Sequence, residues 1–200
     1  MTKDYEIIHR EVIYQGVFCF ARYQLRYRLF NGGYSATVTR ELLERSSAAA
    51  VLPYDPITDQ VVLIEQFRPG AIHRGPHPWL LEIVAGVLSK NEKPEALAAR
   101  EVQEEAGCEA LDLYPICDYF VSPGGSDEYL HLYCARVNAS QSGGLFGLAH
   151  ENEDIRAYVL PVSEALAKLQ AGEIKTGPAI ISLQWLQLHR EFLRNLWQKK

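Results

Sequence analysis

Three glutamates crowd one short segment of this 200-residue chain and constrain its structure more than any other feature. Glu101, Glu104 and Glu105 are spaced so that an α-helix would stack their carboxylates on one face. Like charges at this spacing repel by roughly 0.2–0.5 kcal/mol per pair, even on an exposed helix. A cation would relieve that repulsion, and hard divalent cations prefer carboxylate oxygens. The segment therefore predicts a metal-binding helix, with an ordinary solvated acidic helix as the alternative.

The residues before and after these glutamates predict a strand, a loop and a helix in that order. Residues 80–85, LLEIVA, have the pattern of a buried strand, and Gly86 follows them directly. Pro94 suits a first helical turn, because its missing N–H would be unpaired there in any case. Gly107 supplies a left-handed stop. Lys93 stands where an N-capping Ser, Thr or Asp is expected, so the helix start lacks a side-chain cap.

The segment as a whole matches one known pattern. The matching positions are Gly86, Glu92, Arg100, Glu101, Val102, Glu104, Glu105, Gly107 and Cys108. They resemble the Nudix box, G-x5-E-x7-R-E-U-x-E-E-x-G-U, in which U is apolar. The resemblance implies an α/β fold, the Nudix α/β/α sandwich with a mixed central sheet. It also implies a hydrolase that uses Mg²⁺, or Mn²⁺, with two or three ions in each active site.

Composition argues against several other classes of protein. The net charge of −5 disfavours a nucleic-acid partner, because that affinity depends on Lys and Arg neutralising phosphates. No apolar run approaches the length of about 18 residues that a membrane span needs, so no membrane partner is expected. The first ten residues lack the apolar core of a signal peptide. The four cysteines form no C-x-x-C pair and suit a reducing compartment, so a cytoplasmic location is expected.

The chain is expected to form two domains. Residues 1–45 are rich in aromatic and β-branched residues, and Asn31-Gly32-Gly33 is a hairpin signal. About 45 residues form a marginal core alone, so this segment must pack on the rest of the chain or on a second subunit. Residues 46–200 place strands between helices, as an α/β/α sandwich requires.

The second domain's elements follow from apolar patterning and turn residues. A long loop at residues 137–154 ends in an acidic cluster, and loops of that length are usually functional or disordered. Ser163 is expected to cap the helix that follows. Strands are expected at residues 47–54, 61–68, 79–86, 117–123, 129–137 and 155–161, and helices at residues 94–106, 163–172 and 178–196.

Features beyond the box resemble the ADP-ribose pyrophosphatase branch of the Nudix hydrolases. Pro123 lies sixteen residues after Gly107, the spacing of that branch. Residues 148–155, LAHENEDI, resemble the acidic mobile loop of its bacterial members, and ISLQWLQLHREFLRN resembles their closing helix. The implied reaction is Mg²⁺-dependent hydrolysis of the ADP-ribose pyrophosphate to AMP and ribose 5-phosphate. The implied assembly is a homodimer in which the N-terminal antiparallel β segment is exchanged.

The same resemblance assigns metal-binding and catalytic roles. The expected metal ligands are Ala85 (through its carbonyl), Glu101, Glu105 and Glu153. Glu104 is expected as a further ligand or as a residue that acts through one. Glu151 is the expected general base, with Glu104 as its rival. Alternation would place Glu151 and Glu153 on the same side of an extended loop.

Two residues of the N-terminal segment are expected to contact the adenine. Arg40 would stack on the base across the dimer, and the alternative is an arginine on a strand surface. The branch places an aromatic residue near Gly16 to sandwich the base. This chain has Val17 there, so Phe18 beside it is the candidate, with a core role as the alternative.

Three further residues are candidates for the rest of the substrate. Arg68, at the end of VVLIEQFR, is placed to contact phosphate or to cap its strand. Glu128 is expected to bind the terminal ribose, with a strand-entry carboxylate as the alternative. Glu82 would orient a metal-bound water or a substrate hydroxyl, unless it is a satisfied carboxylate of its strand.

Two other functions stay open at this point. The first is a Nudix pyrophosphatase for another nucleotide sugar such as GDP-mannose, because the box handles only the pyrophosphate. The second is a non-catalytic nucleotide-sensing module. Such sensors often lose box carboxylates, and this chain keeps all of them.

Overall fold

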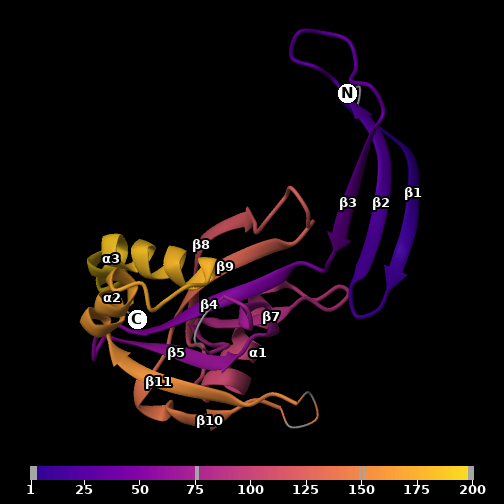
Figure 1. The fold of residues 1–200 in the computed structure, drawn as a ribbon. Coiled ribbons are helices and arrows are strands. Elements are labelled where there is room, and N and C mark those ends of the chain that lie inside the picture. Colours follow the sequence, from indigo (N-terminus) through magenta and orange to yellow (C-terminus); the bar gives the residue numbers. More distant parts are fainter. Residues whose placement is uncertain (1–3, 75–76, 149, 151, 198–200) are drawn as a thin grey trace. The chain divides into compact units, whose positions relative to one another are not determined.

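The chain folds into two compact units. The computed structural model describes residues 4–74, 77–148, 150 and 152–197. One unit contains Met1–Ser47 and Tyr119–Tyr129, and the other contains Ala48–Asp118 and Leu130–Lys200 (Figure 1). Each unit is described by itself below.

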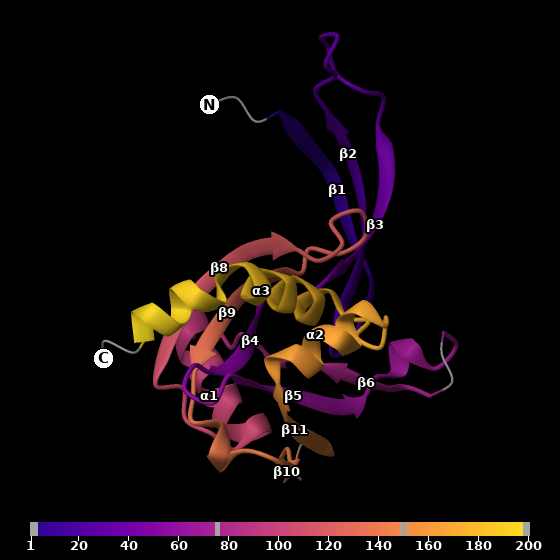
Figure 2. The same ribbon diagram turned by 90° about the vertical axis from the view of Figure 1, so that its left-hand side faces the viewer.

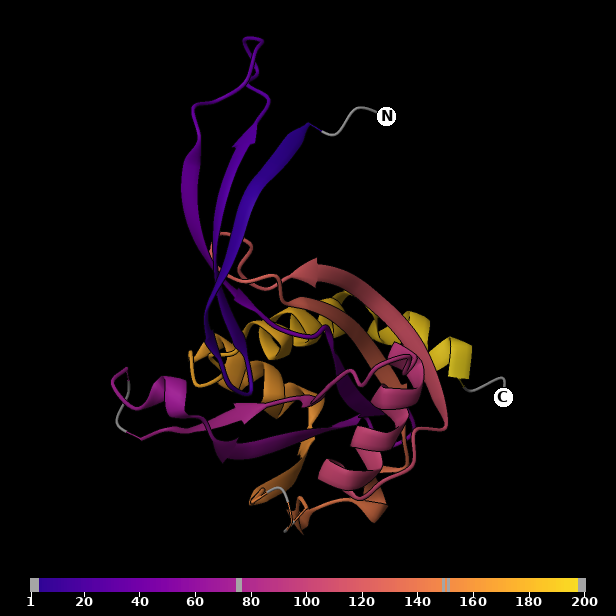
Figure 3. The same cartoon turned by 90° about the vertical axis from the view of Figure 1, so that its right-hand side faces the viewer.

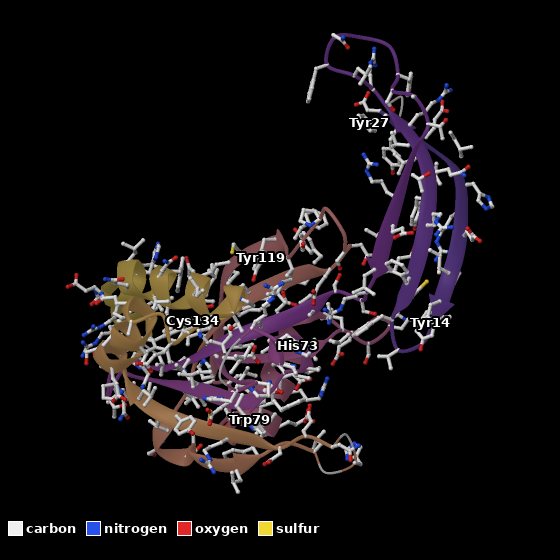
Figure 4. The ribbon with its side chains drawn as sticks, viewed as in Figure 1. Tyr14, Tyr27, His73, Trp79, Tyr119 and Cys134 are labelled. Carbon is white, nitrogen blue, oxygen red and sulfur yellow. The ribbon has the colours of Figure 1, made fainter. Side chains whose placement is uncertain are left out.

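The first unit is built on an antiparallel sheet of three long strands, β1 (Tyr5–Gln15), β2 (Cys19–Tyr27) and β3 (Val38–Glu44), in that order (Figure 1). The β-rich character predicted for this segment is confirmed. Tyr14 and Tyr27 lie at opposite ends of the sheet (Figure 4). Cross-strand partners share a face, so Ile7, Val12, Leu25 and Leu42 lie on one face, called the apolar face below, which also carries Arg10, Arg40 and Glu44. The other face carries Glu6, Glu11, Arg22, Arg26 and Glu41.

The second sheet contains both antiparallel and parallel pairs. Its order is β10-β11-β5-β4-β9-β8, β6 pairs with β5, and β7 pairs with β4. The pair β4–β9 is parallel, whereas β5 is antiparallel to β4, β6 and β11. The predicted mixed sheet is thus confirmed. The strands are β4 (Ala48–Asp55), β5 (Gln60–Phe67), β6 (Trp79–Glu82), β7 (Val84–Val87), β8 (Asp112–Phe120), β9 (Tyr129–Arg136), β10 (Gly144–Phe146) and β11 (Ile155–Pro161).

A fork in this sheet places the segment that precedes the acidic helix. Strands β4 and β5 pair directly only through Tyr54–Val61 and Asp55–Gln60. Beyond those pairs β6 joins β5 and β7 joins β4, with Ile83 between β6 and β7. The strand predicted at residues 79–86 is therefore two short strands that fill the fork.

Helices cover both faces of the sheet. Helix α1 (Pro94–Ala106) lies on one face, and α2 (Val162–Gln170) and α3 (Gly177–Trp197) lie on the other (Figures 2 and 3). On β4, Val51 belongs to the core that contains Val102 of α1, whereas the Tyr54 ring lies 6.4 Å from the Trp197 ring of α3. Odd and even residues of a strand point to opposite faces, so the predicted α/β/α sandwich is confirmed.

The predicted ends of α1 are confirmed, whereas the predicted cap of α2 is wrong. Helix α1 begins at Pro94 with no side-chain cap from Lys93, and Gly107 ends it at a φ of 67°. Ser163 does not cap α2: the helix begins one residue earlier and Pro161 is its N-cap. The predicted loop at residues 137–154 contains a 3₁₀ helix (Ala139–Gln141) and β10.

None of the helices in the described part of the chain combines the length and apolarity needed to cross a membrane.

Candidate active site

The carboxylates of α1 face the end of β7 across a very short distance. A Cβ atom on Gly86 would lie 2.2 Å from Glu101 Oε1. The loop between β7 and α1 is ordered by Ser89, whose N–H donates to Glu92 Oε2 at 3.1 Å. The strand, loop and helix predicted from the sequence therefore bring Glu101 against the chain just after Ala85.

Glu105 is the buried carboxylate of this cluster. Glu105 is only 2% exposed, and its Oε2 accepts a 3.0 Å hydrogen bond from the Ala85 N–H. Burial raises the pKa of Glu105 to about 8, and the Ala85 hydrogen bond opposes that rise. The negative charges of Glu101 and Glu153 raise this pKa further, while Arg68 lowers it. Positive charge is thus in deficit around Glu105.

Arg100 balances the other acidic residues of the box. One guanidinium nitrogen lies 2.6 Å from Glu104 Oε2 and 3.1 Å from Glu101 Oε1, and another lies 3.5 Å from Glu92 Oε1. One positive charge is therefore shared by three carboxylates. Glu104, the rival candidate for the general base, is held by the shortest of these contacts.

The acidic loop reaches the same cluster through Glu153. Glu153 Oε2 accepts a 3.1 Å hydrogen bond from the Leu148 N–H, and the Gly147 N–H donates to the Glu104 carbonyl at 3.4 Å. Gly147 has a φ of 99°, and a Cβ there would lie 2.8 Å from Glu153 Cβ. Glu151, the predicted general base, lies outside the described residues.

The donor chemistry of this cluster fits a hard divalent cation. Glu101, Glu105 and Glu153 supply oxygen ligands, which Mg²⁺ prefers, and burial together with the charges of Glu101 and Glu153 raises the pKa of Glu105. The described residues contain no group of three or more His, Cys, Asp or Glu side chains already set at metal-binding separation. The carboxylates instead face protein donors: the Ala85 N–H for Glu105 and the Leu148 N–H for Glu153.

Arg68 and Glu82 lie at the fork of the sheet. Arg68 Nε donates to Glu82 Oε2 at 2.8 Å, and Glu82 is only 8% exposed. Glu82 pairs with Ile64 across β5 and β6. The same fork holds Gln66, which is buried and whose Nε2 has no hydrogen-bond partner among the described residues. No sequence pattern singled out Gln66, because a glutamine in a strand carries no distinctive signal.

The candidates in the first unit divide into two places. Phe18 and Glu128 both contact Arg45, a residue that the sequence did not single out. Arg40 lies on β3, and its guanidinium donates to the carbonyl of the preceding residue, Thr39, at 2.8 Å. Its pairing with Tyr23 places it on the apolar face of the sheet. Arg40 is thus not part of the Phe18 group within one chain.

Comparison with known proteins places this architecture in a family. The NUDIX domain matches residues 43–180, and the chain belongs to the Nudix family. It is 45% identical over 194 residues to the ADP-ribose pyrophosphatase of Escherichia coli (strain K12), covering 97% of this chain and 93% of that protein. It is 33% identical over 190 residues to the GDP-mannose pyrophosphatase of Yersinia enterocolitica, covering 94% and 98%.

A solved structure shares the fold. A crystal structure of an ADP compounds hydrolase superimposes with a TM-score of 0.72 at 18% identity, covering 98% of this chain and 97% of that one. At this identity the likeness concerns the fold, and it agrees with the mixed sheet between helices described above.

Proposed function

We propose that this protein hydrolyses the pyrophosphate of ADP-ribose, with water, to AMP and ribose 5-phosphate. The observation that carries the proposal is the buried Glu105 beside the charges of Glu101 and Glu153. A cluster of this kind suits a cation-dependent reaction at an anionic diphosphate. The substrate assignment is supported by the 45% identity to an ADP-ribose pyrophosphatase over nearly the whole chain.

The acidic residues would hold Mg²⁺, or Mn²⁺, through carboxylate oxygens and the Ala85 carbonyl. When bound, the cation neutralises the diphosphate and lowers the pKa of a coordinated water. Glu101 and Glu105 serve as ligands, and Glu153 brings a third carboxylate from the loop. The number of ions, two or three, remains a prediction from the resemblance.

The residues around the cluster position these ligands. Arg100 fixes Glu101 and Glu104 on one side of α1. The Ala85 N–H fixes one oxygen of Glu105, which leaves its other oxygen for a cation. Arg68 is held by Glu82 and contributes a positive charge that suits a substrate phosphate.

Glu151 is the proposed general base, and it would accept the proton of the attacking water. The support is indirect: one carboxylate oxygen of its rival Glu104 is engaged by Arg100 at 2.6 Å, and this positive charge makes Glu104 a weaker proton acceptor. Glu151→Gln should therefore lower kcat strongly while Mg²⁺ binding persists. A Glu104→Gln variant with the larger loss of kcat would reverse the assignment.

Substrate recognition by the first unit is assigned to Phe18, Glu128 and Arg40. Phe18 is proposed to contact the adenine and Glu128 the terminal ribose, supported by their common contact with Arg45. Arg40 is proposed to reach the adenine of a second subunit, supported by its exposed position on a different face of the sheet from Leu43.

The direct test is a Mg²⁺-dependent assay with a panel of nucleotide sugars. ADP-ribose should give AMP with the highest kcat/KM, and ¹⁸O-labelled water should locate the attacked phosphorus. GDP-mannose is the second candidate, supported by the 33% identity to the Yersinia enterocolitica enzyme. A higher kcat/KM for GDP-mannose would replace the first proposal. Binding without turnover of any substrate would favour the sensing module.

We also propose a homodimer formed through the first unit. The apolar face of the three-stranded sheet carries Ile7 and Val12, which pair with Leu25 and Ala21. Ile7 is 53% exposed and Val12 is 46% exposed. Exposed apolar side chains on one face of a sheet suit an interaction site. The proposed partner for this face is a second copy of this chain.

We also propose a cytoplasmic location, which the four free cysteines support.

A further inference from the structure

We infer that Arg45 is a positioning residue that holds Phe18 and Glu128 together as one preorganised surface for substrate recognition. The inference rests on the proposed function, because Phe18 and Glu128 are its proposed substrate-binding residues. It concerns only the first unit, which contains all three residues.

The backbone around Arg45 fixes the loop that carries Glu128. The Arg45 N–H donates to Asp127 Oδ1 at 2.6 Å. Two positions earlier, the Leu43 N–H donates to the Gly125 carbonyl at 2.9 Å, and the Asp127 N–H donates to the Leu43 carbonyl at 3.3 Å. Three hydrogen bonds therefore join the end of β3 to the loop before β9.

The Arg45 side chain makes two different contacts at once. One terminal nitrogen lies 3.0 Å from Glu128 Oε2, and the central guanidinium carbon lies 4.5 Å from the centroid of the Phe18 ring. The buried Nε atom has no hydrogen-bond partner among the described residues. The position of the guanidinium carbon over the Phe18 ring is that of a cation–π contact.

The Arg45–Glu128 ion pair is better shielded than the other ion pairs recorded among the described residues of this unit. The side chains of Arg45 and Glu128 are 28% and 16% exposed, whereas those of Arg22 and Glu41 are 42% and 51% exposed. Shielded pairs are less screened by salt than exposed pairs. The Arg45–Glu128 pair therefore restrains the carboxylate, and Arg22–Glu41 offers a matched pair for comparison.

A planar guanidinium is required to do both things. It stacks on an aromatic ring while its edge donates to a carboxylate, and a lysine ammonium cannot combine these contacts. With one part of Phe18 covered by Arg45, the ring (40% exposed) still offers surface to a planar base. Fixing both groups before substrate arrives lowers the cost of ordering them on binding. Arg45 should therefore affect substrate affinity rather than the chemical step.

The test compares Arg45→Gln and Arg45→Lys with Arg22→Gln in steady-state kinetics with ADP-ribose and saturating Mg²⁺. Both Arg45 variants should raise KM by about tenfold or more, with kcat within about twofold of wild type, as expected when uniform binding is lost. Arg22→Gln should leave both constants unchanged. The Arg45→Gln/Glu128→Gln double variant should raise KM by less than the product of the two single increases, because the two residues act as a unit.

The kinetic outcomes distinguish the role of Arg45 from the proposed ADP-ribose hydrolysis. Wild-type protein without ADP-ribose turnover would overturn the proposed function. Wild-type turnover with an unchanged KM in both Arg45 variants would overturn the inference alone. Equal falls in kcat for the Arg45 variants and for Arg22→Gln would do the same, since they would indicate general loss of structure. If Arg45→Gln fails to fold, Arg45→Lys together with Phe18→Leu carries the same comparison of KM with kcat.

Discussion

Gly86 and Glu101 approach each other so closely that no other residue fits at position 86 without displacing the carboxylate. A Cβ atom would lie 2.2 Å from Glu101 Oε1 and 2.4 Å from Cδ. Cγ would lie 2.6 Å away, and since all three atoms belong to the flexible Glu101 side chain, a larger residue would turn that side chain and move the carboxylate. The glycine of the box is thus tied to the position of one predicted metal ligand.

Gly86→Ala should therefore lower activity much more than stability. Displacing the Glu101 carboxylate by about 1 Å should cost roughly 10²-fold in kcat/KM at fixed Mg²⁺, with a melting temperature close to wild type. Gly70→Ala is the matched control, because a Cβ there would meet nothing within 4 Å. Activity lost equally in both variants would contradict the argument.

The raised pKa of Glu105 makes metal-free stability depend on pH. Its pKa is 4.5 in the unfolded chain and about 8 in the folded one. The protonated form is therefore favoured by folding, and stability falls as pH rises from about 4.5 to 8. Glu105→Gln removes this cost, so in EDTA at pH 9 the variant should be more stable than wild type by about 2–4 kcal/mol.

Urea unfolding at pH 5 and pH 9, with and without Mg²⁺, checks this expectation. The stability difference should disappear near pH 5, where Glu105 is protonated in the folded state. Mg²⁺ should stabilise wild type at pH 8 by mass action and leave Glu105→Gln nearly unchanged, and the variant should lose turnover. A variant that is less stable at pH 9 than at pH 5, relative to wild type, would contradict the pKa shift.

The acidic helix could be predicted because its signals are local. Pro94, Gly107 and the spacing of the glutamates each act within one or two turns of the chain. The close approach of Gly86 to Glu101 was not predicted, because it depends on how β7 and α1 pack together. The partners of the carboxylates were less accessible, because the Ala85 N–H and Glu105 meet only after β7 enters the fork of the sheet.

Contacts between residues far apart in the chain could not be predicted from the sequence. Arg45 pairs with Glu128, 83 residues away; Glu128 was a candidate ribose-binding residue, but Arg45 was not singled out. The early start of β8 at Asp112 was missed because Pro115 interrupts the strand pattern. Side-chain capping of α2 was predicted wrongly because Pro161 already supplies the extended N-cap backbone, so Ser163 lies within the first turn.

A second pH dependence belongs to the first unit and has the opposite sign. Hydrogen bonds from Arg10 and Tyr23 lower the pKa of Glu44 from 4.5 to about 2. Glu44 therefore contributes stability that is present above pH 4.5 and lost as pH falls through about 2. Glu44→Gln should remove this dependence, whereas Glu11→Gln, at an exposed pair 3.5 Å from Arg22, should keep it.

Hydrogen exchange of peptides from residues 5–44 measures the effect, with protection corrected for intrinsic rates. Wild-type protection should fall between pH 4.5 and 2, and the Glu44→Gln variant should start lower at pH 5 and change less. Identical acid profiles for wild type and Glu44→Gln would rule out this role for the Arg10–Glu44 pair.

The apolar face of the three-stranded sheet provides the last prediction. Ile7→Glu places a charge on the exposed apolar face, and His9→Glu places the same charge on the opposite face of the same strand. A stable dimer buries roughly 1,200–2,000 Å², and an unpaired charge buried within that area disfavours association. Light scattering should give wild type and His9→Glu twice the 22.6 kDa chain mass and Ile7→Glu a single chain mass. A monomeric wild type, or a dimeric Ile7→Glu, would show that this face does not mediate association, and the exposed Ile7 and Val12 would then need another partner.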